Sequence, residues 1–128
     1  MKTYLLLFLA PYFMAIICSE EDPPVVFTDM IIQNESSATL VFVTVESNEI
    51  DIVTGAQQYI FGGQDPAEAV VPSSIETIDS IVLYTRDLEG NLIEAYRQEP
   101  IDDSFWTFND VGEFDKQYIL ILRDEDLN

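Results

Sequence analysis

Apolar and β-branched residues recur in short runs along most of this chain, and clusters of polar residues separate the runs. Runs of about four to eight such residues bounded by turn residues are typical of β-strands. The pattern predicts strands over Val25–Gln33, Thr39–Glu46, Ile50–Val53, Gln57–Phe61, Ser80–Thr85, Leu92–Arg97, Phe105–Phe108 and Tyr118–Arg123. Thr39–Glu46 is almost continuously apolar, which favours a strand buried on both sides.

The segments between the strands carry turn residues. Gly62-Gly63 is expected to end the fourth strand, and Asp87–Asn91 is typical of a hairpin loop in which Gly90 or Asn91 takes a positive φ. The longest irregular stretch lies between the fourth and fifth strands. Within it, Ala67–Val70 fits a single helical turn capped by Asp65.

Seven or eight short strands without a convincing helix predict an all-β domain over residues 25–128. The expected architecture is an antiparallel β-sandwich, immunoglobulin-like in broad terms, although the two cysteines of true immunoglobulin domains are missing. The apolar fraction of 48% is that of a chain that folds.

The first 17 residues differ from the rest. Lys2 is followed by an uncharged apolar run, 4–17, that Pro11 interrupts. A helix of this length would span roughly 21 Å, short of the ~30 Å hydrocarbon core of a bilayer. Residues 1–17 are therefore interpreted as a secretory signal peptide.

Cys18 is the only cysteine of the chain, and it follows the apolar run directly. The sequence Ala15-Ile16-Ile17-Cys18-Ser19 resembles a lipobox, in which the cysteine thiol receives a lipid and becomes the new N-terminus. The resemblance implies acylation of Cys18 and attachment to a membrane through the lipid. Ordinary cleavage after Ser19, which would release a soluble secreted protein, is the alternative.

Residues 18–24 form an acidic, proline-containing tether. Ser19, Glu20, Glu21 and Asp22 after the cysteine resemble the surface-export signal of Bacteroidetes lipoproteins. The remainder also resembles small surface lipoproteins of Bacteroidetes, and the features that carry this resemblance are Ile31–Ser36, Asp79–Leu83, Trp106 and Tyr118–Leu127. The resemblance implies a lipid-anchored protein at the outer-membrane surface, with a periplasm-facing location as the alternative. It implies no activity.

The charge is strongly one-sided. The chain has 24 acidic and 5 basic residues, a net charge of −19, and loss of Lys2 with the signal would leave −20. Such a polyanion repels the phosphate backbone, so nucleic acid is excluded as a partner. The acids keep the protein soluble, or they receive cations or a basic partner.

Few residue types that carry chemistry are present. The chain has no histidine, and one cysteine permits neither an internal disulfide nor a cysteine-based zinc site, so no cofactor or metal is expected. Neighbouring acids at Asp102-Asp103, Asn109-Asp110 and Asp124–Asp126 are interpreted as solvated groups rather than Ca²⁺ ligands. The loop from Asp87 departs from the calcium-loop pattern because Gln98 replaces the required glutamate. A small sandwich leaves little room for a catalytic cleft, so no enzyme activity is expected.

Two residues remain as candidate sites. Asp79-Ser80-Ile81 resembles the short O-glycosylation motif of Bacteroidetes exported proteins, which implies a modified Ser80. Trp106, the only tryptophan, either packs in the core or stacks on a sugar as an exposed aromatic. The expected function is a non-catalytic binding or structural module with a protein partner, and the alternative is a glycan-binding accessory domain.

Overall fold

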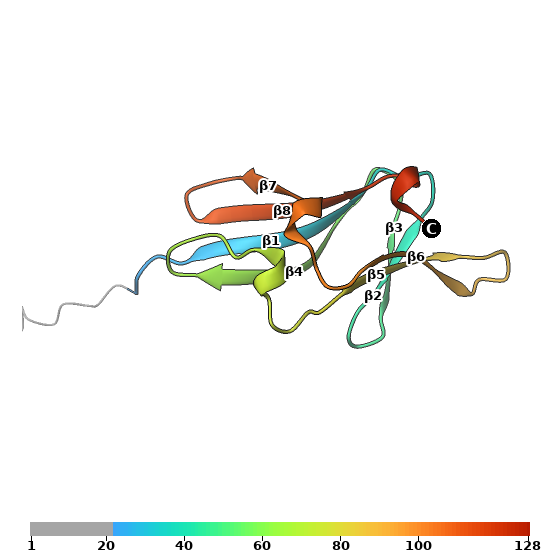
Figure 1. Cartoon of the computed structure of the whole chain (residues 1–128), viewed down its shortest axis with the longest axis horizontal. Helices are drawn as coiled ribbons and strands as arrows, with labels where there is room; N and C mark the ends of the chain where they lie inside the picture. Colours follow the sequence, from blue (N-terminus) through green and yellow to red (C-terminus); the bar gives the residue numbers. More distant parts are fainter. Residues whose placement is uncertain (1–21) are drawn as a thin grey trace, which may run out of the picture.

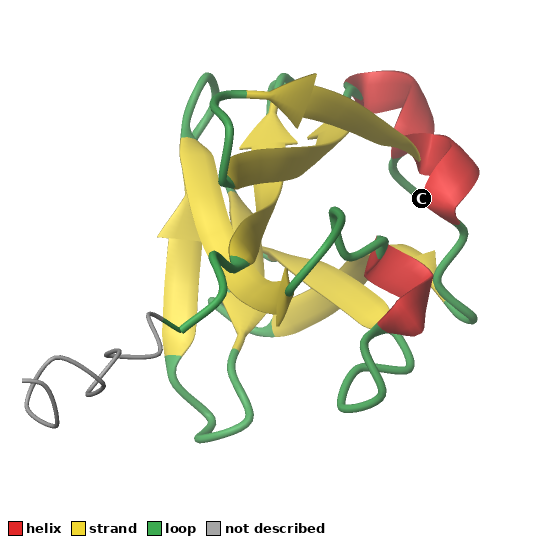
Figure 2. Cartoon of the chain, turned by 90° about the vertical axis from the view of Figure 1, so that its left-hand side faces the viewer, coloured by secondary structure: helices red, strands yellow, loops and turns green. Residues whose placement is uncertain are grey.

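The computed structural model describes residues 22–128 as two four-stranded β-sheets (Figure 1). The strands are β1 (Val26–Asn34), β2 (Leu40–Val43), β3 (Glu49–Ile52), β4 (Gln57–Asp65), β5 (Ile81–Arg86), β6 (Leu92–Gln98), β7 (Trp106–Asp110) and β8 (Asp115–Leu122). The described residues contain no α-helix, only the short 3₁₀ turns Pro72–Ser74, Asp103–Phe105 and Asp124–Asp126. The expected all-β sandwich is confirmed, and its two sheets diverge on one side (Figure 2).

One sheet has the strand order β4-β1-β8-β7 and the other β3-β2-β5-β6. Neighbouring strands are antiparallel except for β1 and β8, the first and last strands, which pair in parallel from Phe27–Asp115 to Asn34–Leu122. β2 and β3 form a hairpin within one sheet, whereas the corresponding B and C strands of immunoglobulin domains lie in different sheets. The likeness to immunoglobulin domains is thus one of layering and not of strand order.

Side chains from both sheets fill the core. Alternation along β1 turns Met30 and Ile32 inward, beside Leu120 and Leu122 of β8. The facing sheet contributes Leu40, Ile52, Ile81, Leu83 and Ala95, and Ile101 together with Trp106 of β7 completes the core. The core therefore lies between the two sheets and packs against the parallel pair of β1 and β8.

β4 does not end at Gly62-Gly63, contrary to expectation, but continues to Asp65. The following loop folds back over the strand, and the backbone N–H of Val70 donates to Thr28 Oγ1 at 3.0 Å. A Cβ on Gly63 would lie 2.9 Å from Val70 Cγ1. Gly63 therefore makes room for the returning loop instead of ending the strand.

Ala67–Val70 forms no helical turn. Asp65 Oδ1 accepts hydrogen bonds from the backbone N–H groups of Ala67 (2.8 Å) and Glu68 (3.1 Å), as a helix cap would. The next residues pack on β1 because Val70 N–H donates to Thr28 Oγ1. This tertiary hydrogen bond takes the place of the backbone bond that Val70 N–H would make within a helical turn.

The turn after β1 is built around a buried asparagine. Asn34 is fully buried, and its Nδ2 donates to the carbonyl oxygens of Ala38 (2.8 Å) and Ile52 (2.7 Å). Its Oδ1 accepts from the backbone N–H (3.0 Å) and hydroxyl (2.6 Å) of Ser36. Asn34 and Ser36 thus satisfy the backbone where the chain crosses between sheets.

The turns after β5 and after β2 set where these strands end. Gly90 has φ +87°, as expected for the hairpin loop between β5 and β6. β2 ends at Val43, earlier than predicted, because Thr44 N–H donates to Asn48 O at 2.9 Å and starts a tight turn. Val45 therefore lies in a turn and is fully exposed.

Candidate functional site

Trp106 is a core residue with 6% of its surface exposed. Its indole Nε1 donates to Gln98 Oε1 at 3.1 Å, and its ring packs edge-on against Phe61 with centroids 6.5 Å apart. Of the two alternatives for Trp106, packing in the core is confirmed, and an exposed sugar-stacking aromatic is wrong because the indole is buried. The large ring and its polar nitrogen are both satisfied inside the sandwich.

The neighbouring acids act as local hydrogen-bond acceptors. Asp102 Oδ1 accepts from Ser104 N–H at 2.9 Å, and the Ser104 hydroxyl and then this backbone bond lower the pKa of Asp102. Asp103 reaches another loop, where its oxygens accept from Ser73 N–H (2.8 Å) and Ser73 Oγ (2.6 Å). These two carboxylates thus serve separate turns and form no pair.

The same holds for the two other acidic loops. Asp124 Oδ1 accepts from Ser37 N–H (2.7 Å) and Ser37 Oγ (2.8 Å), and these bonds lower the pKa of Asp124. In the β5–β6 loop the Asn91 side chain, and then backbone N–H groups including that of Glu89, lower the pKa of Asp87. Within residues 22–128, no three acidic side chains gather closely enough to hold a metal ion.

Every basic side chain in the described part of the chain lies against an acid. The pairs are Arg86 with Glu49 and Asp51, Arg97 with Glu94 and Glu99, Lys116 with Asp110, and Arg123 with Glu35. All four cations are thereby neutralised, and the large surplus of carboxylates leaves the surface negative. Electrostatic attraction from this surface acts on positively charged partners.

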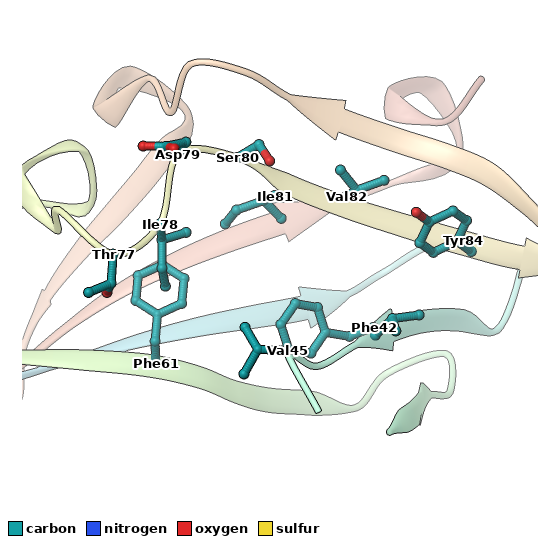
Figure 3. A pocket seen from close by; sticks show the side chains of 11 residues that line it. Phe42, Val45, Phe61, Thr77, Ile78, Asp79, Ser80, Ile81, Val82 and Tyr84 are labelled. Carbon is teal, nitrogen blue, oxygen red and sulfur yellow. The ribbon is translucent and has the colours of Figure 1, made fainter. Parts of the chain in front are cut away.

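The candidate site is an apolar groove of about 440 Å³ between β2, β4 and β5 (Figure 3). Phe42 and Val45, from β2 and the turn after it, line one wall with Phe61 of β4. The opposite wall is formed by the loop into β5 and by that strand, with side chains of Thr77, Ile78, Asp79, Ser80, Ile81, Val82 and Tyr84. The groove therefore opens where the two sheets diverge.

The groove exists because β2 and β5 pair only briefly. Their ladder consists of Val41–Tyr84 and Phe42–Leu83. Beyond it β2 turns toward β3, whereas β5 extends back to Ile81, so the two strands separate. Apolar side chains that a longer ladder would cover are thereby left open on one side.

The one carboxylate of the groove, Asp79, lies at one end, and the Tyr84 hydroxyl lies toward the other (Figure 3). Asp79 is exposed and Ser80 is half-buried directly before β5. An adjoining depression shares Ile78 and Asp79 with the groove and adds Glu76 and Glu99 to its lining. The groove is thus lined by apolar side chains together with the hydroxyls of Thr77, Ser80 and Tyr84, and it is acidic at the Asp79 end.

The remaining predicted site residues lie at or before the start of the described chain. Cys18, Ser19, Glu20 and Glu21 lie outside the described residues, and Asp22 is exposed ahead of β1. Among residues 22–128 no helix has the length and hydropathy needed to cross a bilayer.

A scan of protein-family models found no match to this chain, and searches of curated proteins and of solved structures found no similar protein. Sequence reasoning missed the groove because its walls come from segments far apart in the chain. The one local signal was the mostly apolar run Leu40–Val45, which extends two residues beyond the end of β2.

Proposed function

We propose that this protein is a non-catalytic binding module of the cell envelope, anchored by a lipid on Cys18, that engages a protein partner through the groove between β2, β4 and β5. The groove carries the proposal because it exposes contiguous apolar side chains, among them Phe42, Val45 and Ile78. Open apolar concavities on small proteins are typical of binding surfaces.

Binding explains the groove better than catalysis does. Asp79 is the only ionisable carboxylate among its lining residues, and no second acid or nucleophile with a base faces it there. Glycoside hydrolysis needs two carboxyl groups held at a defined separation, and nucleophilic catalysis by a hydroxyl needs a base beside it. The sugar-binding alternative loses its main support because Trp106 is buried.

The anchor is supported by the chain ahead of the sandwich. Asp22, Pro23 and Pro24 are exposed and precede β1 directly. Prolines favour an extended linker, and acids beside an anionic membrane are repelled from it. Such a tether holds the domain away from the membrane, and we place it at the outer-membrane surface, with a periplasm-facing or secreted protein as the alternatives.

The anchor is tested by Cys18→Ser in the full-length protein. We expect the wild type in the membrane fraction and the variant in the soluble fraction, and intact-mass analysis of the membrane-extracted wild type should show loss of residues 1–17 and the added acyl chains. Ser19→Ala, which keeps the thiol, is the matched control and should remain with the membrane. A Cys18→Ser protein that fractionates like the wild type would contradict the anchor.

A further inference from the structure

Two strand segments that line the groove are not paired with each other. β2 and β5 stop pairing after Phe42–Leu83, so the next residues, Val43 and Val82, have no partner in the β2–β5 register, yet both line the groove. A peptide in extended conformation uses such strand edges for backbone hydrogen bonds and places alternate side chains in the adjoining pocket.

The negative charge of the protein determines which kind of peptide the groove would attract. The chain carries −19, and the four cations in the described part of the chain are already paired with acids. Asp79 stands at the end of the groove, with Glu76 and Glu99 in the adjoining depression. A second copy of this chain would bring an equal negative charge, whereas a basic segment would be attracted.

We propose that the groove binds an extended segment of a partner protein in which apolar side chains are followed by lysines or arginines. The apolar side chains lie against Phe42, Val45 and Ile78, and the basic side chains reach the acids around Asp79. This inference rests on the proposed binding function and names the partner's chemistry.

The probe is a synthetic peptide, acetyl-Lys-Lys-Val-Tyr-Val-Val-Lys-Lys-amide, carrying a fluorophore and titrated with the purified full-length protein. Two matched peptides replace all lysines by glutamates or all apolar residues by serines. We expect the basic apolar peptide to bind and both matched peptides to bind at least about tenfold more weakly, and we expect its affinity to fall as salt rises.

Exposed positions allow the groove to be altered without disturbing the core. Val45→Asp and Asp79→Lys should each weaken binding by about tenfold or more, because the first places a charge in the apolar wall and the second removes the attraction. Leu88→Asp, at an equally exposed apolar position on the β5–β6 loop, and Glu125→Lys, at an exposed acid outside the groove, are the matched controls and should bind like the wild type.

Three results would overturn the proposal: no binding of the basic apolar peptide, equal binding of the glutamate peptide, or equal losses in the control variants. Self-association that competes with the peptide, measured by sedimentation of the wild type, would assign the groove to a second copy and would also overturn it. Since these measurements use purified protein, they are independent of the anchor, which the fractionation of Cys18→Ser tests separately.

Discussion

At the residue scale, the aspartates of this acidic protein have individual structural roles. Asp124 accepts two hydrogen bonds from Ser37, a residue from the opposite end of the sequence. These bonds lower the pKa of Asp124 below its ordinary value of 3.8 because they favour the ionised carboxylate. The last turn of the chain is thereby joined to the turn after β1.

The lowered pKa predicts a defined dependence on pH. Since the folded pKa lies below the unfolded one, Asp124 contributes stability above pH 3.8, and this contribution is lost as the pH falls through the folded pKa. Urea titrations should show wild type more stable than Asp124→Asn near neutral pH, with the difference narrowing below about pH 4.

Glu125→Gln is the control for the change in net charge, since Glu125 takes part in no hydrogen bond or ion pair among the described residues. Both variants remove one negative charge, so the repulsion among the remaining carboxylates falls by a similar amount in both. Equal pH profiles of the two variants would show that the bonds to Ser37 contribute nothing.

At the scale of elements, β4 shows how a strand and the loop that follows it determine each other. Gly63 lies inside the strand, and Val70 of the returning loop occupies the space that a side chain at 63 would need. The loop is held in this position by the bond from Val70 N–H to Thr28 Oγ1.

Gly63→Ala should therefore destabilise the protein by about 1–3 kcal/mol, although alanine normally improves a strand relative to glycine. Val70→Gly in the same chain should recover part of the loss, with a coupling of about 1 kcal/mol in a double-mutant cycle of denaturation free energies. The cycle uses Val70→Gly because alanine would keep the Cβ of Val70, which lies 3.0 Å from the added atom.

Gly112→Ala is the control for the glycine effect. The nearest atom to an added Cβ there, Asp115 Oδ2, is 3.8 Å away, so the expected change is within about 0.5 kcal/mol. Additive effects of Gly63→Ala and Val70→Gly would contradict the packing argument.

At the scale of the whole molecule, repulsion between carboxylates opposes the compact state. The net charge is −19, and the acids of the described loops are dispersed among separate turns. The melting temperature should rise between low and moderate NaCl, because salt screens charges that folding brings together.

Ca²⁺ and Mg²⁺ at matched ionic strength should shift the melting temperature by the same amount, since no three acids converge within residues 22–128. A differential scanning calorimetry series in the two salts measures this. A saturable shift specific to Ca²⁺ would require a site that these residues do not form, and a melting temperature independent of NaCl would show that repulsion is unimportant.

Local patterns in the sequence were enough to predict the strands and the hairpin loop around Gly90, because alternation, β-branching and turn residues act over a few positions. They were not enough for β4, where Gly62-Gly63 looked like a stop, or for Ala67–Val70, where Asp65 looked like a helix cap. In both places the packing of Val70 decided the outcome, and Val70 is held by a bond to Thr28, which lies 42 positions away in the chain.

By itself the sequence determined the all-β class and the strong negative charge, since these follow from composition and short-range periodicity. Only the tertiary structure decided the parallel pairing of β1 with β8 and the position of the groove. The physical reason is that the groove arises where β2 and β5 separate, and separation between strands depends on which segments meet in space rather than on neighbours in the chain.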